Sequence, residues 1–306
     1  MRTLFVTATG ALRAPWRVLL FFGATFVCGA LISSLGYGAL SLTPLVGLAR
    51  TYRVPLDQFG AVAALGLGTW IALRVDGRGV ALWSRVGLDG PAWRARPAVL
   101  GLALGALGIL LPSAILLGAG RFVFEAQGGD ATWMAAAGAS LFLLAPAALV
   151  EELLMRGYLL AALREAVGVR AAVILTSLSF ALLHLFNPHP TVLSTLTVGL
   201  AGVFLAAVRL ATGSLVAAWT AHFAWNFAQA AVLHAPVSGL PLAVSGYRLA
   251  DHGPAWLTGG SWGPEGGLAA AAGMLLATFL VVRRPTMGAP GGSALSDLPV
   301  ENGTNA

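Results

Sequence analysis

Eight apolar runs, each close to the length needed to cross a lipid bilayer, constrain the fold of this chain more than any other feature. They cover residues 18–40, 59–75, 98–120, 132–163, 170–187, 190–209, 214–235 and 265–282. A helix needs about 20 residues to cross a hydrocarbon core about 30 Å thick. The runs lack the alternating pattern of membrane-barrel strands. We therefore predict an all-α fold, a polytopic transmembrane helix bundle with about eight spans.

The overall composition agrees with a place in a membrane. Hydrophobic residues make up 58% of the 306, charged residues only 10%, and the mean hydropathy is +0.82. So few polar side chains cannot cover a soluble globule of this size. The chain has no lysine and is rich in alanine, glycine and arginine, as in bacteria with GC-rich genomes. We expect an integral protein of the bacterial inner (plasma) membrane, surrounded by the lipid bilayer.

The arginines are concentrated before the first run and after the second, fourth, sixth and eighth. They are Arg2, Arg13, Arg17, Arg74, Arg78, Arg85, Arg94, Arg96, Arg164, Arg170, Arg209, Arg283 and Arg284. Because cytoplasmic loops carry an excess of basic residues, the N-terminus and the C-terminus are both predicted to be cytoplasmic. This asymmetry explains the net charge of +6, so the charge is not a sign of nucleic-acid binding.

Residues 1–284 are predicted to form a single transmembrane domain. The tail 285–306 is rich in glycine, proline and small polar residues, and we expect it to be disordered. Cys28 is the only cysteine, which excludes an intrachain disulfide and a thiol metal cluster. Nothing in the pattern indicates an oligomeric state.

Three charged side chains interrupt the fourth run. Glu151, Glu152 and Arg156 lie within six positions of ALVEELLMRGYL, although an ionisable group at mid-membrane costs about 2.5–3.5 kcal/mol on insertion scales. Glu152 and Arg156 are four residues apart and stack on one helix face, whereas Glu151 points about 100° away from Glu152. The pair can therefore be neutralised internally while Glu151 faces something else. A salt-bridged patch that locks helix packing is the alternative reading of this segment.

Two more polar groups of residues lie on later runs. His184 follows Phe180 by one turn in SFALLHLF, and His222 and Asn226 share a face in TAHFAWNFAQ. At 1.5 Å per residue from the arginine-marked ends, Glu151, His184 and Asn226 each lie about 18–21 Å deep, and His222 about 12 Å. We therefore expect these side chains to meet at a similar depth.

Such a set of groups is suited to hydrolysis. A carboxylate in an apolar site can take a proton from water, a histidine can orient that water, and histidine and asparagine can donate to an oxyanion. Two histidines and a carboxylate are equally a possible zinc site with an open position, which would use Glu151, His184 and His222. The sequence leaves both schemes open. A serine or cysteine nucleophile has less support, because the G-x-S-x-G motif is absent and no histidine lies near Cys28.

At these residues the chain resembles the CAAX-processing and bacteriocin-processing (CPBP, or Abi) intramembrane proteases. Their pattern E-E-x-x-x-R, F-x-x-x-H and H-x-x-x-N/D reads here as Glu151-Glu152 with Arg156, Phe180 with His184, and His222 with Asn226. The resemblance covers about residues 130–235, where we place the protease-like core.

The resemblance implies an intramembrane endopeptidase, a hydrolase whose site is reached from the cytoplasmic side. Glu151 is then the principal carboxylate, acting on water with His184. His222 and Asn226 stabilise the oxyanion or help to hold a metal, and Glu152 and Arg156 support them. The family includes members described as metalloproteases, so a zinc cofactor is possible but not required. The implied substrate is a membrane-anchored or hydrophobic peptide.

Two other classes of function remain as alternatives. A proton-coupled transporter also uses buried glutamate and histidine, but it needs polar residues that continue to both membrane faces. A catalytically silent relative would keep the fold and act as a membrane scaffold, or bind a partner in immunity. Replacing Glu151 by alanine separates the scaffold from the protease, because a scaffold should keep its function and a protease should lose it.

Overall fold

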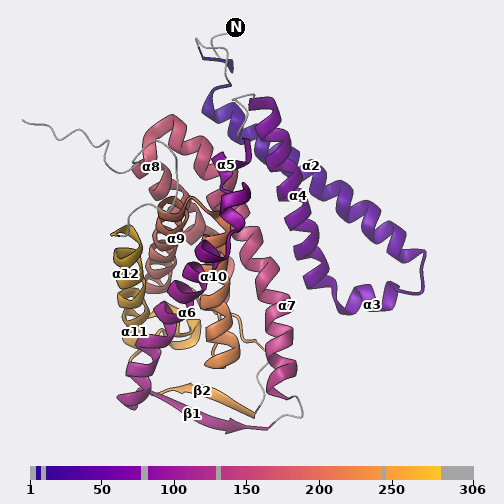
Figure 1. Cartoon of the computed structure of the whole chain (residues 1–306). Coiled ribbons are helices and arrows are strands. Elements are labelled where there is room, and N and C mark those ends of the chain that lie inside the picture. The colour runs from indigo at the N-terminus through magenta and orange to yellow at the C-terminus, as the bar shows by residue number, and fades with distance from the viewer. Residues whose placement is uncertain (1–4, 8–11, 77–81, 129–131, 243–245, 284–306) are drawn as a thin grey trace, which may run out of the picture.

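The computed structural model describes residues 5–7, 12–76, 82–128, 132–242 and 246–283 (Figure 1). The α-helices are α2 (Ala14–Ser41), α3 (Val46–Thr51), α4 (Arg53–Asp76), α5 (Leu82–Val86), α6 (Ala95–Gly118), α7 (Trp133–Glu152), α8 (Leu159–Leu183), α9 (Val192–Thr212), α10 (Leu215–Phe227), α11 (Ala255–Thr258) and α12 (Leu268–Val282). Two π-helical segments cover Leu153–Tyr158 and Ala228–Val232, and short 3-10 turns cover Gly90–Trp93, His184–Phe186, Gly260–Trp262 and Pro264–Gly266. The strands are β1 (Phe122–Gln127) and β2 (Gly246–Asp251). The predicted disordered tail, 285–306, lies outside the described residues.

The described residues confirm a helical membrane bundle. They contain five apolar helical stretches long enough to cross a bilayer, with bounds Ala14–Ser41, Arg53–Asp76, Ala95–Gly118, Trp133–Phe186 and Val192–Thr212. The predicted runs 214–235 and 265–282 appear as shorter helices, α10 with its π-helical extension and α12. The count of eight crossings and the cytoplasmic placement of both termini remain predictions from the sequence.

The predicted span 132–163 is wrong as one regular helix. The stretch Trp133–Phe186 is continuous over 54 residues, but its regular α-helix ends at Glu152 and a π-helical segment follows. Within that segment Gly157 has φ −82° and ψ −122°, and farther on Gly168 has φ 83° and ψ 166°. Since a left-handed φ suits glycine, Gly168 divides the fourth and fifth predicted spans. The first of the two breaks, the π-helical segment, directly follows Glu151 and Glu152.

A small two-stranded sheet adds to the predicted helical bundle. Strands β1 and β2 pair antiparallel, with Phe122 opposite Asp251 and Gln127 opposite Gly246. The sheet lies at the end of the bundle where α7 begins, as Figure 1 shows. Each strand has only six residues, and the four α-helices α7 to α10 separate the two in the chain. A local hydrophobic pattern cannot reveal such a distant pairing.

Strong terminal signals define α9 and α10, the two helices that run past the centre of the bundle. Thr191 and Ser194 form a reciprocal capping box at the start of α9, and Gly213, with φ 68°, ends it. Ser214 then accepts a hydrogen bond from the backbone N–H of Ala217 and starts α10. The tight connection makes α9 and α10 antiparallel neighbours.

Helix α10 packs directly against α6. A Cβ atom placed on Gly105 would lie 1.9 Å from the carbonyl oxygen of Ala221, so only glycine allows this approach. On its other side, Trp219 Nε1 donates to the carbonyl oxygen of Ala145 in α7 at 2.8 Å. These contacts fix the position of the α10 turn that carries His222.

Helices α2, α3 and α4 form an arm that diverges from the rest of the bundle in Figure 1. A group of four charged residues joins the arm to α5 and α8, and we call it the arginine-end cluster: Arg17, Asp76, Arg85 and Glu165. Asp76 Oδ2 lies 2.9 Å from Arg17 Nη2 and 2.8 Å from Arg85 Nη2, and Glu165 lies 2.8 Å and 2.9 Å from the same two arginines. Burial alone would lower the pKa of Arg85, but its hydrogen bonds and proximity to both carboxylates outweigh this and raise it. The cluster therefore holds its charges paired.

Candidate active site

Glu152 and Arg156 form a fully buried ion pair at the break between α7 and α8. Both side chains are 0% exposed, and Arg156 Nη1 donates to Glu152 Oε1 at 3.0 Å. Arg156 also donates to the carbonyl oxygen of Gly202 in α9 at 3.1 Å, and its guanidinium lies 4.4 Å from the centre of the Phe180 ring. The pairing predicted from their spacing is confirmed, and it connects three helices.

Glu152 also positions the first histidine. His222 Nδ1 donates to Glu152 Oε1 at 2.9 Å. The ring stands edge-on to Phe180, with centroids 5.9 Å apart. Because Nδ1 is engaged, the Nε2 atom of His222 points away from the pair and toward Glu151, 3.7 Å from Glu151 Oε2.

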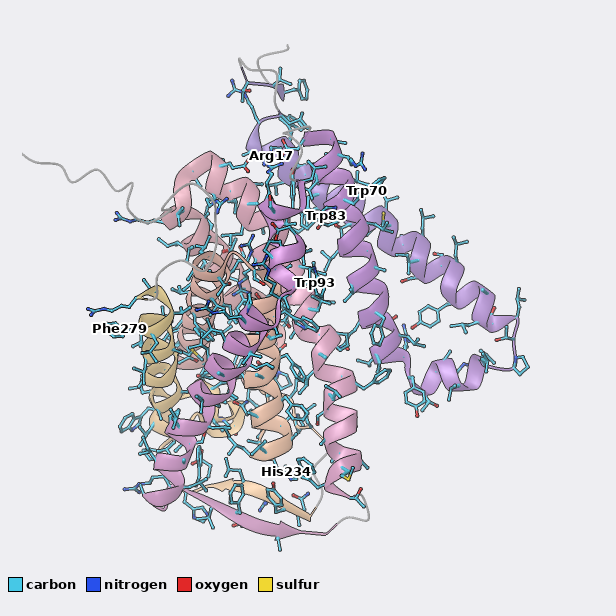
Figure 2. The ribbon with its side chains drawn as sticks, viewed as in Figure 1. Arg17, Trp70, Trp83, Trp93, His234 and Phe279 are labelled. Atoms are coloured by element: carbon cyan, nitrogen blue, oxygen red, sulfur yellow. The ribbon has the colours of Figure 1, made fainter. Side chains whose placement is uncertain are left out.

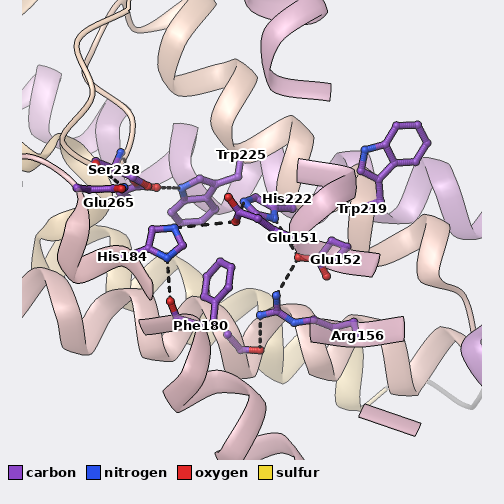
Figure 3. A network of polar contacts seen from close by, with 12 residues as sticks. Glu151, Glu152, Arg156, Phe180, His184, Trp219, His222, Trp225, Ser238 and Glu265 are labelled. Carbon is purple, nitrogen blue, oxygen red and sulfur yellow. Dashed lines mark hydrogen bonds and ion pairs between the residues drawn. The ribbon is translucent and has the colours of Figure 1, made fainter. Parts of the chain in front are cut away.

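The second histidine is oriented in the same way by a different acceptor. His184 Nδ1 donates to the carbonyl oxygen of Phe180 at 2.8 Å. A carbonyl only accepts, so this bond places the proton on Nδ1. The Nε2 atom of His184 then faces Glu151, with 3.9 Å between Nε2 and Glu151 Oε2. Two imidazole Nε2 atoms, one from the 3-10 turn that follows α8 and one from α10, thus converge on one carboxylate, as Figure 3 shows.

Glu151 differs from its neighbour in its surroundings. Its side chain is 37% exposed, whereas that of Glu152 is 0%. Among the described residues no donor lies within hydrogen-bond distance of Glu151 Oε2. The prediction that Glu151 faces away from the ion pair is confirmed. This carboxylate oxygen is held near two imidazoles without being bonded to either.

A cavity of about 490 Å³ gives access to these groups. Glu151, His184, His222 and Asn226 all line it, together with apolar residues of α4, α7 and the segment 237–242. Asn226 lies one turn beyond His222 on the same face of α10, as its spacing predicted. All six predicted site residues are therefore brought into one region: five are linked by polar distances of 2.9–3.9 Å, and Asn226 lies along the wall of the cavity.

A second carboxylate beside the site was not predicted from the sequence. Glu265, only 7% exposed, accepts from Trp225 Nε1 at 3.0 Å and from Ser238 Oγ at 2.8 Å. Trp225 is the neighbour of Asn226, and Ser238 lines the cavity. Figure 3 shows Glu265 and Ser238 beside the histidines. The only available signal was the indole directly before Asn226, and nothing in the sequence connects it to residue 265.

The alternative of a zinc ion bound by Glu151, His184 and His222 depends on the chemistry and the positions of these three side chains. Each histidine donates through Nδ1 to a carbonyl or carboxylate, as metal-bound histidines do, so the chemistry of the donors suits zinc. Within the described parts of the chain, however, no group of three histidine, cysteine, aspartate or glutamate side chains that could hold a metal ion is present as the side chains stand. We derive no step through a metal.

A match to a protein-family model covers the part of the chain that carries the site. Residues 132–228 match the family model described as type II CAAX prenyl endopeptidase Rce1-like. The matched segment includes all six predicted site residues and confirms the resemblance to the CAAX-processing family. No curated protein and no solved structure matches the chain.

Proposed function

Residues 132–228 are similar to the Rce1-like type II CAAX prenyl endopeptidases, and from this premise we propose that the chain is an intramembrane endopeptidase. Its substrate is a membrane-anchored or hydrophobic polypeptide, and its setting is the bacterial inner membrane. One observation carries the proposal: Glu151 Oε2 lies 3.7 Å and 3.9 Å from the Nε2 atoms of His222 and His184 in a cavity. A water molecule in the cavity beside these atoms can hydrogen-bond to the carboxylate and to an imidazole nitrogen at the same time.

The proposed reaction begins with that water. Glu151 accepts a proton from it while His184 Nε2 accepts its second hydrogen bond, so that the oxygen attacks the peptide carbonyl carbon. The side-chain amide of Asn226 donates to the carbonyl oxygen and stabilises the charge that develops there, and His222 adds to this when it is protonated, because its Nε2 then also carries a hydrogen. As the carbon–nitrogen bond breaks, the proton on Glu151 passes to the departing amine. The products are a carboxylic acid and an amine.

Glu152, Arg156 and Phe180 position these groups without touching the substrate. Glu152 fixes the tautomer and direction of His222, the carbonyl of Phe180 does the same for His184, and Arg156 neutralises Glu152. Fixed orientation matters because a donor must already point to where charge develops. The transporter alternative has less support, because buried apolar residues, among them Met155 and Leu159, lie between the site and the arginine-end cluster.

The proposal is tested with purified protein in liposomes and a set of single-span fluorescent reporters that carry different apolar cleavable segments. Wild type is compared with Glu151→Gln and His184→Ala. Glu125→Gln is the matched control, because Glu125 lies on β1 and pairs with Arg248. A chelator is added in a parallel series and zinc is restored afterwards.

We expect cleavage by wild type and by Glu125→Gln, and none by the two site variants. Cleavage that persists under chelation supports water activation by the glutamate, whereas loss with recovery on adding zinc makes the protein a metalloendopeptidase. If Glu151→Gln cleaves like wild type, the proposed mechanism is wrong. If wild type cleaves no reporter while a bound partner is recovered with wild type and Glu151→Gln alike, the silent scaffold replaces it.

A further inference from the structure

Most of the residues that line the cavity lie between the site and the β1–β2 sheet. On α4 it is lined by Val54 and Gln58, in the first six residues of that helix, and on α8 by its last turn. It continues along the segment 237–242, where Leu240 is 46% exposed. The lining residues of α4 and α8 lie at the ends of these helices that are nearer to the β1–β2 sheet, and the segment 237–242 leads into β2. The cavity therefore runs from Glu151 toward the sheet end of the bundle.

The opposite direction is closed. Met155 and Phe180, which are each 3% exposed, form the inner wall of the cavity. Both belong to a buried apolar cluster that continues through Leu73 and Tyr158. Beyond Tyr158 lies Asp76 of the arginine-end cluster, 3.4 Å from the tyrosine hydroxyl. Close-packed side chains and paired charges thus separate Glu151 from that end of the molecule.

The distribution of arginine identifies the two ends. Ten of the described arginines lie at the end of the arginine-end cluster, where α2 begins and α4, α9 and α12 end: Arg13, Arg17, Arg74, Arg85, Arg94, Arg96, Arg164, Arg170, Arg209 and Arg283. Four lie at the sheet end, namely Arg50, Arg53, Arg121 and Arg248. Figure 2 marks the two ends with Arg17 and His234. By the positive-inside rule the arginine-rich end is cytoplasmic, so the cavity opens toward the other side.

The residues that line the cavity also restrict what can enter. Glu151 is the only carboxylate among them, and no arginine lines the cavity; the rest are mostly leucine, valine and other apolar residues. A substrate carboxylate would find no cation other than histidine and would face Glu151. An extended, uncharged, apolar stretch fits this lining because it buries apolar surface without leaving a charge unpaired.

From these observations we propose that the site takes its substrate from the non-cytoplasmic side of the membrane. The substrate is an uncharged apolar stretch at the non-cytoplasmic end of a membrane-anchored protein, cut within the chain rather than recognised by its C-terminal carboxylate. This proposal rests on the proposed protease function. It is the opposite of the cytoplasmic access implied by the family resemblance.

The first test locates the cavity mouth without requiring activity. Cys28 is the only cysteine, so in a Cys28→Ala background the labelling of one introduced cysteine can be measured at a time. Leu240→Cys reports on the mouth, and Trp83→Cys, on α5 and 39% exposed, reports on the arginine-rich end. Intact spheroplasts are treated with a membrane-impermeant maleimide. We expect Leu240→Cys to be labelled at once and Trp83→Cys only after permeabilisation; the reverse pattern overturns the proposal.

The second test asks from which side cleavage occurs. Two single-span reporters carry the same apolar cleavable stretch, one at the non-cytoplasmic end of the anchor and one at the cytoplasmic end. We expect cleavage of the first to exceed that of the second at least tenfold, and a bulky maleimide on Leu240→Cys to slow it. Preferential cleavage of the second reporter would overturn the proposal that substrate enters from the non-cytoplasmic side, while the proposed protease function would stand. Cleavage of neither overturns the protease function, while the labelling pattern still decides which way the cavity opens.

Discussion

Two clusters of buried charge in this molecule resemble each other in composition but not in pairing. In the arginine-end cluster, Asp76 and Glu165 both contact the same two arginines at 2.8–2.9 Å. At the candidate site, Glu152 is paired with Arg156 in the same manner, but the adjacent Glu151 is 3.7 Å or more from its nearest basic groups.

The difference separates a structural role from a chemical one. A buried carboxylate in direct contact with a cation is stabilised as an ion and has little tendency to take up a proton. A carboxylate held just short of its neighbours, beside a cavity, is available to a third group that enters between them. We therefore expect variants of the arginine-end cluster to lose stability, and variants of Glu151 to lose activity.

Glu151→Gln should give the largest effect. We expect cleavage to fall by about 10²–10⁴-fold, as for the loss of a general base, with little change in the midpoint of thermal unfolding because the side chain is partly exposed. Reporter cleavage and a thermal melt on the same preparation measure both. A loss of activity that is matched by a large fall in the melting midpoint would place Glu151 with the structural charges.

Arg156→Met should be the most destabilising of the charge variants. It leaves Glu152 as an unpaired buried charge, which costs about 3–5 kcal/mol. The double variant Glu152→Gln with Arg156→Met should recover part of that loss, because no buried charge remains. Thermal unfolding in detergent measures the difference. Equal stability of Arg156→Met and wild type would show that the pair is not needed for folding.

Asp76→Asn tests the other cluster. The substitution keeps the shape of the side chain but weakens two charge-assisted hydrogen bonds, so we expect a loss of about 1.5–3 kcal/mol. Since the site lies on the far side of the apolar cluster, the folded fraction should keep its rate of cleavage. Activity is measured against the amount of folded protein. A fall in rate without a fall in stability would contradict the comparison.

The exposed pair of Glu125 and Arg248 on the sheet should have the smallest effect. The hydrogen bond from Arg248 lowers the pKa of Glu125, so its stabilisation is present at neutral pH and is lost as the pH falls through the lowered value. Solvent screens this pair, and we expect Glu125→Gln to leave the melting midpoint unchanged at neutral pH. A slightly lower protection of the β1 amides of wild type at acid pH, measured as the exchange rate relative to the intrinsic rate at that pH, would show the effect. A clear fall in the midpoint at neutral pH would contradict it.

Much of the molecule could be predicted because the bilayer imposes a strong rule on sequence. The apolar runs around α2, α4, α6 and α9 were recognisable from length alone. The pairing of Glu152 with Arg156 followed from their spacing on a helix. The break after Glu152 could not be predicted, because a π-helical segment and an ordinary helix share the same apolar composition.

By itself the sequence determined that this chain is a helical membrane protein, and it identified the glutamates, histidines and asparagine that the fold gathers in and beside one cavity. Both results depend on local spacing and on the cost of placing charge in lipid. Only the tertiary structure decided that Glu151 stays unpaired while Glu152 is bonded, that Glu265 supports the neighbouring wall, and toward which end the cavity runs. These depend on contacts between residues that are far apart in the chain, for example Glu152 with His222 and Glu265 with Trp225, and no local pattern encodes them.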